Sequence, residues 1–212
     1  LASLNDGRYE DAETAYRKAL ALAPDDAYLH NDYGILLEGL GRLDEAEAQY
    51  RAAIRLEPDD ATWLGNLGDV LVAQGRRAEA IAAYRDLLAR TPDSLTARNN
   101  LALLLAAAGD VAAAVGEWRA ALALDPDLPQ AHAALGFIAY AYDWDWEAAE
   151  IELKRAIQTK PGYVTAHHWY AEYLSWMGRH EEAIAEIDRA HEIDPLSLII
   201  NYMKAYVHFY AR

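Results

Sequence analysis

Prolines recur along this chain at a nearly constant spacing, and no other feature restricts the fold as strongly. Successive members of the series are 34, 34, 34, 35 and 34 residues apart, and one further proline, Pro129, lies outside it. The series comprises Pro24, Pro58, Pro92, Pro126, Pro161 and Pro195. Because proline cannot continue a helix, each of these residues marks the end of one. A period of about 20 to 50 residues along a whole chain predicts stacked repeats and not a single globular core.

Glycine, alanine and large side chains keep step with these prolines. The glycine 17 residues before the proline is Gly7, Gly41, Gly75, Gly109 or Gly178. The alanine 12 residues before it is Ala12, Ala46, Ala80, Ala114, Ala149 or Ala183. The large residue eight before it is Tyr16, Tyr50, Tyr84, Trp118, Leu153 or Ile187. A further small residue, 24 or 25 before it, is Gly34, Gly68, Ala102, Gly136 or Ala171. Glycine suits a tight turn, and the alanine and the large anchor share one helical face, so each unit is predicted to be a helix-turn-helix pair.

This register of small residue, large anchor and proline resembles the tetratricopeptide repeat family over essentially the whole chain. The resemblance implies an all-α, right-handed superhelical solenoid in a single domain, 1–212. The expected units are a half repeat 1–26, full repeats 27–60, 61–94, 95–128, 129–163 and 164–197, and a half repeat 198–212. The early tryptophan of the family pattern is replaced by His30, Leu64, Arg98, His132 and His167. The stretch 142–195 also resembles the repeat-containing tail of bacterial sensor and regulator proteins, which implies an accessory, non-catalytic module.

Charge and composition exclude several classes of partner. The formal net charge is −15, which disfavours nucleic acid and anionic membrane surfaces and permits basic partners. No apolar run is long enough for a membrane span, so we expect no membrane insertion. The chain contains no cysteine, so disulfides and thiolate chemistry are excluded. Arginine is far commoner than lysine, which hints at a bacterial or archaeal source, whereas the compartment stays undetermined.

Motifs for catalysis or metal binding are not found in the sequence. His167 and His168 are adjacent, so on a helix they point in different directions and cannot chelate one ion together. The stretch from His180 resembles the start of a zinc-protease helix, but Ile184 stands where the second histidine is required. The histidines are therefore expected on a solvated surface or in a groove. We expect no enzyme activity, no metal and no cofactor.

The single 35-residue step locates an irregularity in the segment 140–146. The turn glycine is absent there, and Asp143 or Asp145 is expected to cap the following helix. Trp144 and Trp146 lie in the same short turn. One interpretation is that they wedge the altered turn against neighbouring helices. The other is that they form an exposed aromatic hot spot for a partner.

The resemblance implies that the first helix of each unit lines an inner groove. The candidate groove-binding residues are Asn31, Asn66, Asn99, Asn100, His168, Trp169 and Trp176, and Glu172 also faces inward. An asparagine amide both donates and accepts hydrogen bonds, so these asparagines could clamp the backbone of an extended peptide. A polar lining that contacts only water is the alternative. The basic residues with which some relatives hold acidic chain termini are missing here.

Both ends of the sequence fall within a repeat, and the final helix is apolar all round. An all-round apolar helix is expected to be covered on several sides. We predict head-to-tail self-association, as a ring or a filament, in which the last helix of one copy packs on the first of another. The candidate residues are Tyr9, Tyr16, Leu20, Ile199, Tyr202, Met203, Tyr206, Phe209 and Tyr210. The alternatives are a segment of a longer solenoid and end helices that fold back.

The sequence thus predicts a non-catalytic scaffold for protein–protein interaction. Its partners would be copies of itself, an extended peptide, or both. The alternative function is a peptide-binding adaptor segment of a larger bacterial regulatory protein.

Overall fold

The computed structural model describes residues 2–210, and their side chains from residue 8 onward. Within that range the chain forms twelve α-helices and one π-helix, with no strand. The first helices of the repeats are α2 (Ala27–Gly39), α4 (Thr62–Ala73), α6 (Leu95–Ala107), α8 (Pro129–Ile138), α10 (Val164–Trp176) and α12 (Leu198–Tyr210). The second helices are α1 (Ala2–Leu22), α3 (Leu43–Leu56), α5 (Arg77–Arg90), α7 (Val111–Leu124), α9 (Trp146–Thr159) and α11 (His180–Ile193). The predicted all-α class and repeat pattern are confirmed.

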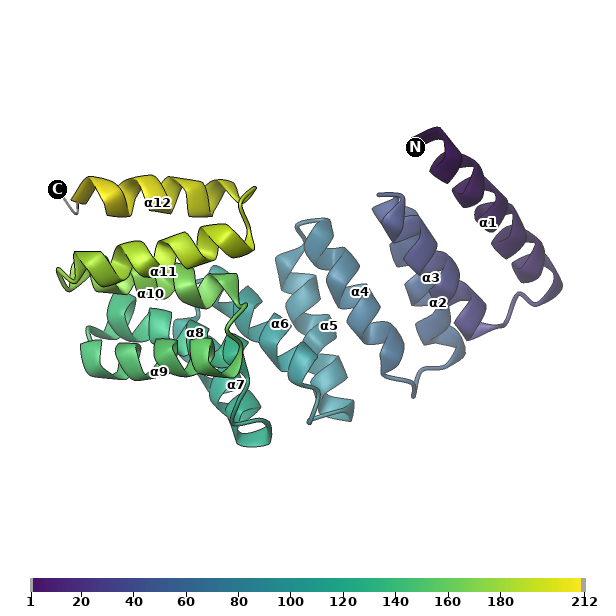
Figure 1. The fold of residues 1–212 in the computed structure, drawn as a ribbon. Helices are drawn as coiled ribbons and strands as arrows, with labels where there is room; N and C mark the ends of the chain where they lie inside the picture. Colours follow the sequence, from purple (N-terminus) through teal and green to yellow (C-terminus); the bar gives the residue numbers. More distant parts are fainter. Residues whose placement is uncertain (1, 211–212) are drawn as a thin grey trace. The chain divides into compact units, whose positions relative to one another are not determined.

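The helices divide into two compact units, Leu1–Asp110 and Val111–Arg212. Unit 1 holds α1 to α6 and unit 2 holds α7 to α12, and in each unit antiparallel helices stack in chain order (Figure 1). The boundary falls inside the expected repeat 95–128, which gives α6 to unit 1 and α7 to unit 2. Each unit therefore carries its own core.

The core repeats one arrangement of a large side chain over a small one. The Tyr50 ring lies against Gly34, where an added Cβ would approach Cε1 to 2.6 Å. The same position on α4, Gly68, lies under Tyr84, where an added Cβ would approach Cζ to 2.8 Å. In unit 2 Leu153 covers Gly136. The second-helix alanines of the complete repeats, such as Ala46 and Ala80, are fully buried. The anchor and the small residue therefore set how closely the two helices of a repeat approach, because close packing leaves no room for another methyl group.

Glycines with positive φ close most of the turns inside the repeats. Gly41, Gly75, Gly109 and Gly178 have φ between 72° and 87°, a region open to glycine and strained for other residues. The expected turn at Gly7 is wrong, because α1 runs through it as one continuous helix. A helical glycine costs about 1 kcal/mol relative to alanine, which the rest of a 21-residue helix can offset.

Histidines at the early position of three repeats join each first helix to the preceding proline. His30, His132 and His167 place Nε2 at 3.0, 2.8 and 2.8 Å from the carbonyl oxygens of the prolines six residues earlier. His167 is buried, so the expectation of a solvated or groove histidine is wrong for it. These side chains satisfy proline carbonyls in the turns that follow the second helices α1, α7 and α9.

The irregular turn is a π-helix, Ala139–Asp143, that ends at Trp144. Trp144 has φ 58°, a left-handed conformation that strains a bulky side chain. Asp145 caps α9, since its Oδ1 accepts a 3.0 Å hydrogen bond from the Ala148 amide. Trp146 packs against Tyr173 with ring centroids 6.3 Å apart, as the wedge interpretation predicts, whereas Trp144 stays exposed.

Candidate interaction surfaces

Large apolar side chains are exposed along one face of the first helices of unit 1. These side chains are Tyr28, Ile35, Val72 and Leu103. They come from three consecutive first helices, α2, α4 and α6, and the second helices cover the opposite faces. We call this the first-helix face of unit 1. An apolar face that stays exposed across three helices is typical of a protein-binding surface.

The asparagines predicted to clamp a peptide make hydrogen bonds within unit 1. Asn66 Nδ2 donates to Asn31 Oδ1 over 2.6 Å, and Asn31 is only 7% exposed. Asn100 Nδ2 donates to Asp69 and to the Tyr84 hydroxyl, at 3.3 and 3.2 Å. Asn99 is half-buried beside them. Part of the amide capacity therefore links neighbouring first helices instead of facing a ligand.

The first-helix face of unit 2 carries aromatic rings from α8, α10 and α12. The Phe137 ring lies 5.0 Å from Trp169 and 5.4 Å from Tyr140, between centroids. The Tyr140 hydroxyl donates to Glu172 Oε2 over 3.1 Å. Burial, Tyr210 and the negative charge of Glu172 raise the pKa of Tyr206 on α12. Glu172 thus contacts Tyr140 of the π-helix and lies within electrostatic reach of Tyr206 on α12.

The other predicted groove residues of unit 2 differ in accessibility. His168 is buried, and that burial lowers its pKa, so the imidazole is neutral near pH 7. Trp169 is half-buried against Phe137, and Trp176 is exposed. Trp169 and Trp176 are therefore the predicted groove residues that a partner of this unit could reach.

Helix α12 divides the predicted self-association residues into two groups. Met203 is buried with Ile200 and Val207 in the core against α10 and α11, so its assignment to an exposed contact is wrong. These three residues point inward together, because residues three or four positions apart lie on the same helical face. The exposed members are Ile199, Tyr202, Phe209 and Tyr210, and Tyr206 is half-buried.

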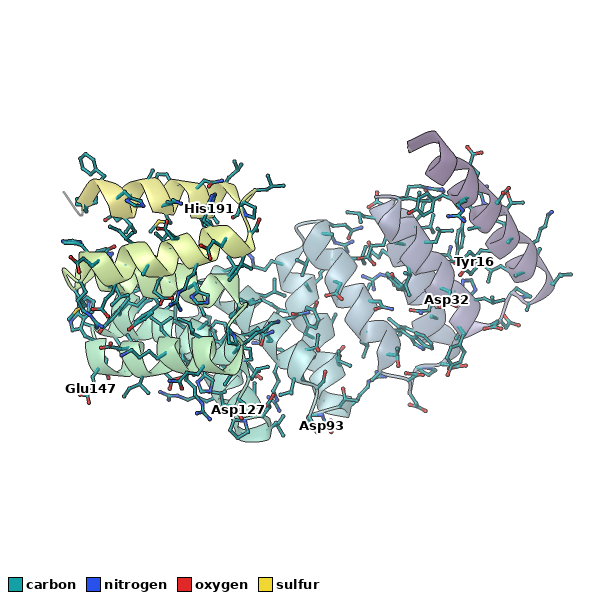
Figure 2. All side chains as sticks on the ribbon, viewed as in Figure 1. Tyr16, Asp32, Asp93, Asp127, Glu147 and His191 are labelled. Carbon is teal, nitrogen blue, oxygen red and sulfur yellow. The ribbon has the colours of Figure 1, made fainter. Side chains whose placement is uncertain are left out.

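Helix α1 is covered on one side, by α2. Tyr16 stacks on Tyr33 with centroids 5.8 Å apart, and Figure 2 shows it between α1 and its neighbours. Leu20 is half-buried and Tyr9 is exposed. Among the other apolar side chains described on α1, Leu22 is also exposed.

Half-buried glutamates on the second helices are paired with cations. Glu13 contacts Arg42, Glu47 contacts Arg76 and Glu150 contacts Arg179, each across to the next repeat. Two more pair with histidines, Glu152 with His132 and Glu186 with His167. The Lys154 and Arg179 hydrogen bonds lower the pKa of Glu150 to about 2. In these five cases a charge that loses water gains a counter-ion.

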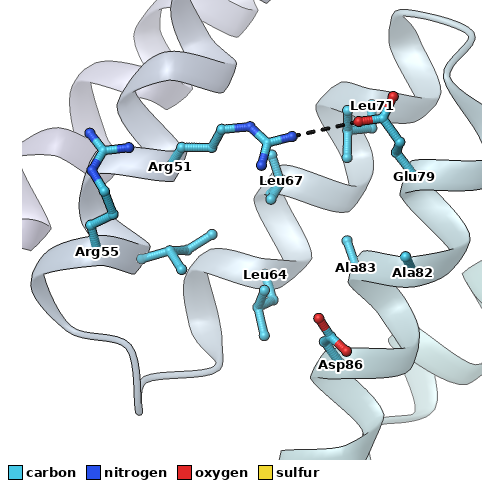
Figure 3. A pocket seen from close by; sticks show the side chains of 10 residues that line it. Arg51, Arg55, Leu64, Leu67, Leu71, Glu79, Ala82, Ala83 and Asp86 are labelled. Carbon is cyan, nitrogen blue, oxygen red and sulfur yellow. Dashed lines mark ion pairs between the residues drawn. The ribbon is translucent and has the colours of Figure 1, made fainter.

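A pocket of about 390 Å³ opens between α3, α4 and α5 in unit 1. Its apolar floor includes Leu64, Leu67 and Leu71, and its rim carries an Arg51–Glu79 ion pair of 3.7 Å (Figure 3). Arg55 and Asp86 also line the pocket, so it combines an apolar floor with charged side chains of both signs.

Membrane spans and metal clusters are both missing from the part of the chain that the structure describes. No helix there is long and apolar enough to cross a membrane. No group of three or more His, Asp or Glu side chains there could hold a metal ion.

Comparison with known proteins places the fold. The family model described as tetratricopeptide repeat matches residues 1–61 and 66–129. A solved structure from a functional characterisation of Pseudomonas aeruginosa pilF aligns with TM-score 0.77 and 21% identity over 97% of this chain and 93% of that one. TTC0263, a thermophilic TPR protein of Thermus thermophilus, aligns with TM-score 0.68 and 25% identity over 87% of this chain and 100% of that one.

A third structure, YrrB, is described as a TPR protein with an unusual peptide-binding site. It aligns with TM-score 0.65 and 21% identity over 90% of this chain and 98% of that one. Comparison with curated protein sequences gave no match. The family model covers more than half of the sequence, and the helices repeat with the register that the model describes. This chain therefore belongs to the tetratricopeptide repeat family.

Proposed function

We propose that this chain is an adaptor that receives a segment of a partner protein on its first-helix faces. Proteins of this family are in general non-catalytic scaffolds for protein–protein interaction, and some bind peptides. The observation that carries the proposal is the position of the exposed large apolar side chains. Ile35 and Leu103 are exposed and directly follow the small residue of their helices. The same position is Asp69 on α4, and in unit 2 it holds the half-buried Phe137, Glu172 and Tyr206.

The energetic basis is apolar burial at side chains that already sit on rigid helices. Covering one Val, Leu, Ile or Phe contributes about 1.5–3 kcal/mol. Several such side chains must be covered together, because association costs at least about 4 kcal/mol in lost translation and rotation. Each unit has several exposed side chains that a partner could cover together. They are Ile35, Val72 and Leu103 on unit 1, and Tyr202 and Trp176 on unit 2.

Selection of peptides from a random library on the intact chain tests the adaptor proposal. Leu103→Glu should weaken the binding of peptides to unit 1 by about tenfold or more, because it places a charge in an apolar contact. Tyr202→Glu should weaken the binding of peptides to unit 2 by a similar factor for the same reason. Ile151→Glu is the matched control, because Ile151 is 61% exposed but lies on the second helix α9. Peptides that respond to Ile151→Glu and ignore both other changes would overturn the proposal.

We also propose self-association, on a separate observation about α1. Ala46 and Tyr50 of a complete repeat are fully buried, whereas their counterparts on α1, Ala12 and Tyr16, are only half-buried. The side that a first helix would cover is open on α1. On α12 the small residue Ala205 is exposed, whereas its counterpart Ala171 is fully buried.

Packing α12 of one copy on α1 of another would place Tyr16 over Ala205. Tyrosine anchors pair with glycine in this chain, Tyr50 with Gly34 and Tyr84 with Gly68, because a Cβ there would clash with the ring. A tyrosine over Ala205 must therefore shift, which weakens the contact. Heterologous contacts of this kind form rings or filaments.

The size mismatch gives a sharp test by sedimentation equilibrium at high micromolar concentration. Ala205→Gly should tighten association, and Ala205→Glu or Phe209→Glu should abolish it. Ile151→Glu again serves as the control for a general loss of apolar surface. A monomer under all conditions, or association that ignores every change at Ala205, would rule out this mode.

A further inference from the structure

Glu172 is a half-buried carboxylate that no cation neutralises within the described residues. Its one hydrogen-bond donor is the neutral Tyr140 hydroxyl, at 3.1 Å from Oε2. Burial raises the pKa of Glu172, and the Tyr140 hydrogen bond only partly opposes this. Its neighbour one turn earlier on α10, His168, is neutral near pH 7 and supplies no charge. Glu172 thus differs from the five second-helix glutamates, each of which contacts Arg or His.

Removing a carboxylate from water without a counter-ion is unfavourable, and an incoming cation relieves that cost. The one lysine of α12, Lys204, forms an ion pair with Asp188, with 2.9 Å between Nζ and Oδ1. The second oxygen of Glu172, Oε1, makes no hydrogen bond to a described residue. A carboxylate offers about four acceptor positions, so most of its capacity is open to a ligand.

Aromatic rings beside Glu172 favour a flat, weakly hydrated cation. Trp169 precedes Glu172 by three residues and lies on the same side of α10. Tyr206 on α12 is close enough for the Glu172 charge to contribute to its raised pKa. Aromatic faces attract cations, arginine more often than lysine, and a guanidinium can stack on a ring while it donates to a carboxylate.

We propose that Glu172, together with the rings of Trp169 and Tyr206, binds the guanidinium group of an arginine in a partner protein. This inference rests on the proposed adaptor function, because it names what the first-helix face of unit 2 recognises. The net charge of −15 attracts such a basic segment over a longer range. The carboxylate then supplies the specificity that the general charge cannot.

NMR titration of the full chain at pH 7 tests this site with two peptides. The first is acetyl-Ala-Ala-Arg-Ala-Ala-amide, and the second replaces arginine by citrulline, which has nearly the same shape without the charge. We expect the arginine peptide to shift the Trp169 indole resonance and the amides around Glu172 and Tyr206. The citrulline peptide should bind about tenfold more weakly or worse, since the charge-assisted hydrogen bonds are lost. This comparison uses the unaltered protein, so it does not depend on how a variant folds.

A pair of variants separates the site from general electrostatics. Glu172→Gln should reduce binding of the arginine peptide to that of the citrulline peptide. Glu147→Gln removes the same charge from an exposed position on α9, which Figure 2 shows at the edge of unit 2, and should leave binding unchanged.

Equal binding of the two peptides, or equal losses in the two variants, would overturn the inference. Library peptides that bind unit 2 through Tyr202 without any arginine would also overturn it, while the adaptor proposal would survive. If no peptide binds either first-helix face, the adaptor proposal itself fails.

Discussion

Two glycines on α4 allow the packing rule of this fold to be measured with an internal control. Gly65 and Gly68 are three residues apart in the same helix, so an alanine gains about the same helix propensity at both, about 1 kcal/mol. Their surroundings differ. A Cβ at Gly65 would meet Leu87 Cδ2 at 3.6 Å, which is ordinary contact, whereas a Cβ at Gly68 would meet three atoms of the Tyr84 ring at 2.8 to 3.1 Å.

The Tyr84 ring cannot move away without losing polar contacts. Its hydroxyl donates to Asp69 and accepts from Asn100 Nδ2. Overpacking of this kind costs about 1–3 kcal/mol. Gly65→Ala should therefore stabilise unit 1 by about 1 kcal/mol, and Gly68→Ala should leave it unchanged or destabilise it by up to about 2 kcal/mol.

Urea unfolding followed by circular dichroism measures the difference. Repeat arrays need not unfold in two states, so all curves should be fitted with one nearest-neighbour scheme and compared with the unaltered chain. Gly116→Ala on α7, where an added Cβ meets nothing within 4 Å, should stabilise the chain as Gly65→Ala does. If Gly68→Ala stabilises as much as Gly65→Ala, the close approach of Tyr84 to α4 does not limit packing and the reasoning is refuted.

Three further predictions concern pH and backbone strain. Burial would lower the pKa of His167, but its hydrogen bonds to Glu186 and Pro161 outweigh burial and raise it. The contribution of His167 to stability is therefore complete below about pH 6.5 and is lost as the pH rises through the folded pKa. In thermal melts between pH 6 and 9, Glu186→Gln should make this loss of stability smaller. A larger loss in the variant would contradict the prediction. Conversely, Glu150 has a pKa of about 2, so it stabilises the fold at pH values above the pKa of the unfolded state and loses that contribution as the pH falls toward 2. Arg179→Met should reduce this acid dependence in urea unfolding. An unchanged pH profile would argue against the Glu150–Arg179 pair. Trp144→Gly should stabilise unit 2 by about 1 kcal/mol, because glycine adopts the left-handed conformation at this position without strain. Trp144→Ala should not stabilise it. Equal melting temperatures of the two variants would contradict the backbone strain.

The repeat register was readable from the sequence because it depends on local chemistry. Proline ends helices, glycine takes positive φ, and a small residue admits a large one wherever they occur, so Pro58, Gly41 and the Tyr50–Gly34 pair behave as their spacing predicts. The same local logic failed at Gly7, which lies inside the continuous helix α1 and not in a turn. The Pro-to-His spacing of six residues was present in the sequence, but the hydrogen bond between them depends on how the turn before the first helix folds.

Accessibility and pairing were decided by tertiary structure alone. The sequence predicts that Met203 and Tyr202 belong to one apolar helix, but only packing against α10 and α11 buries Met203 and leaves Tyr202 exposed. The charge of Glu172 is visible in the sequence, whereas its lack of a counter-ion depends on which side chains three separate helices bring together. Periodicity fixes which residues share a face, because a helix repeats every 3.6 residues. What that face meets depends on residues about 30 to 35 positions away, whose identity the period does not specify.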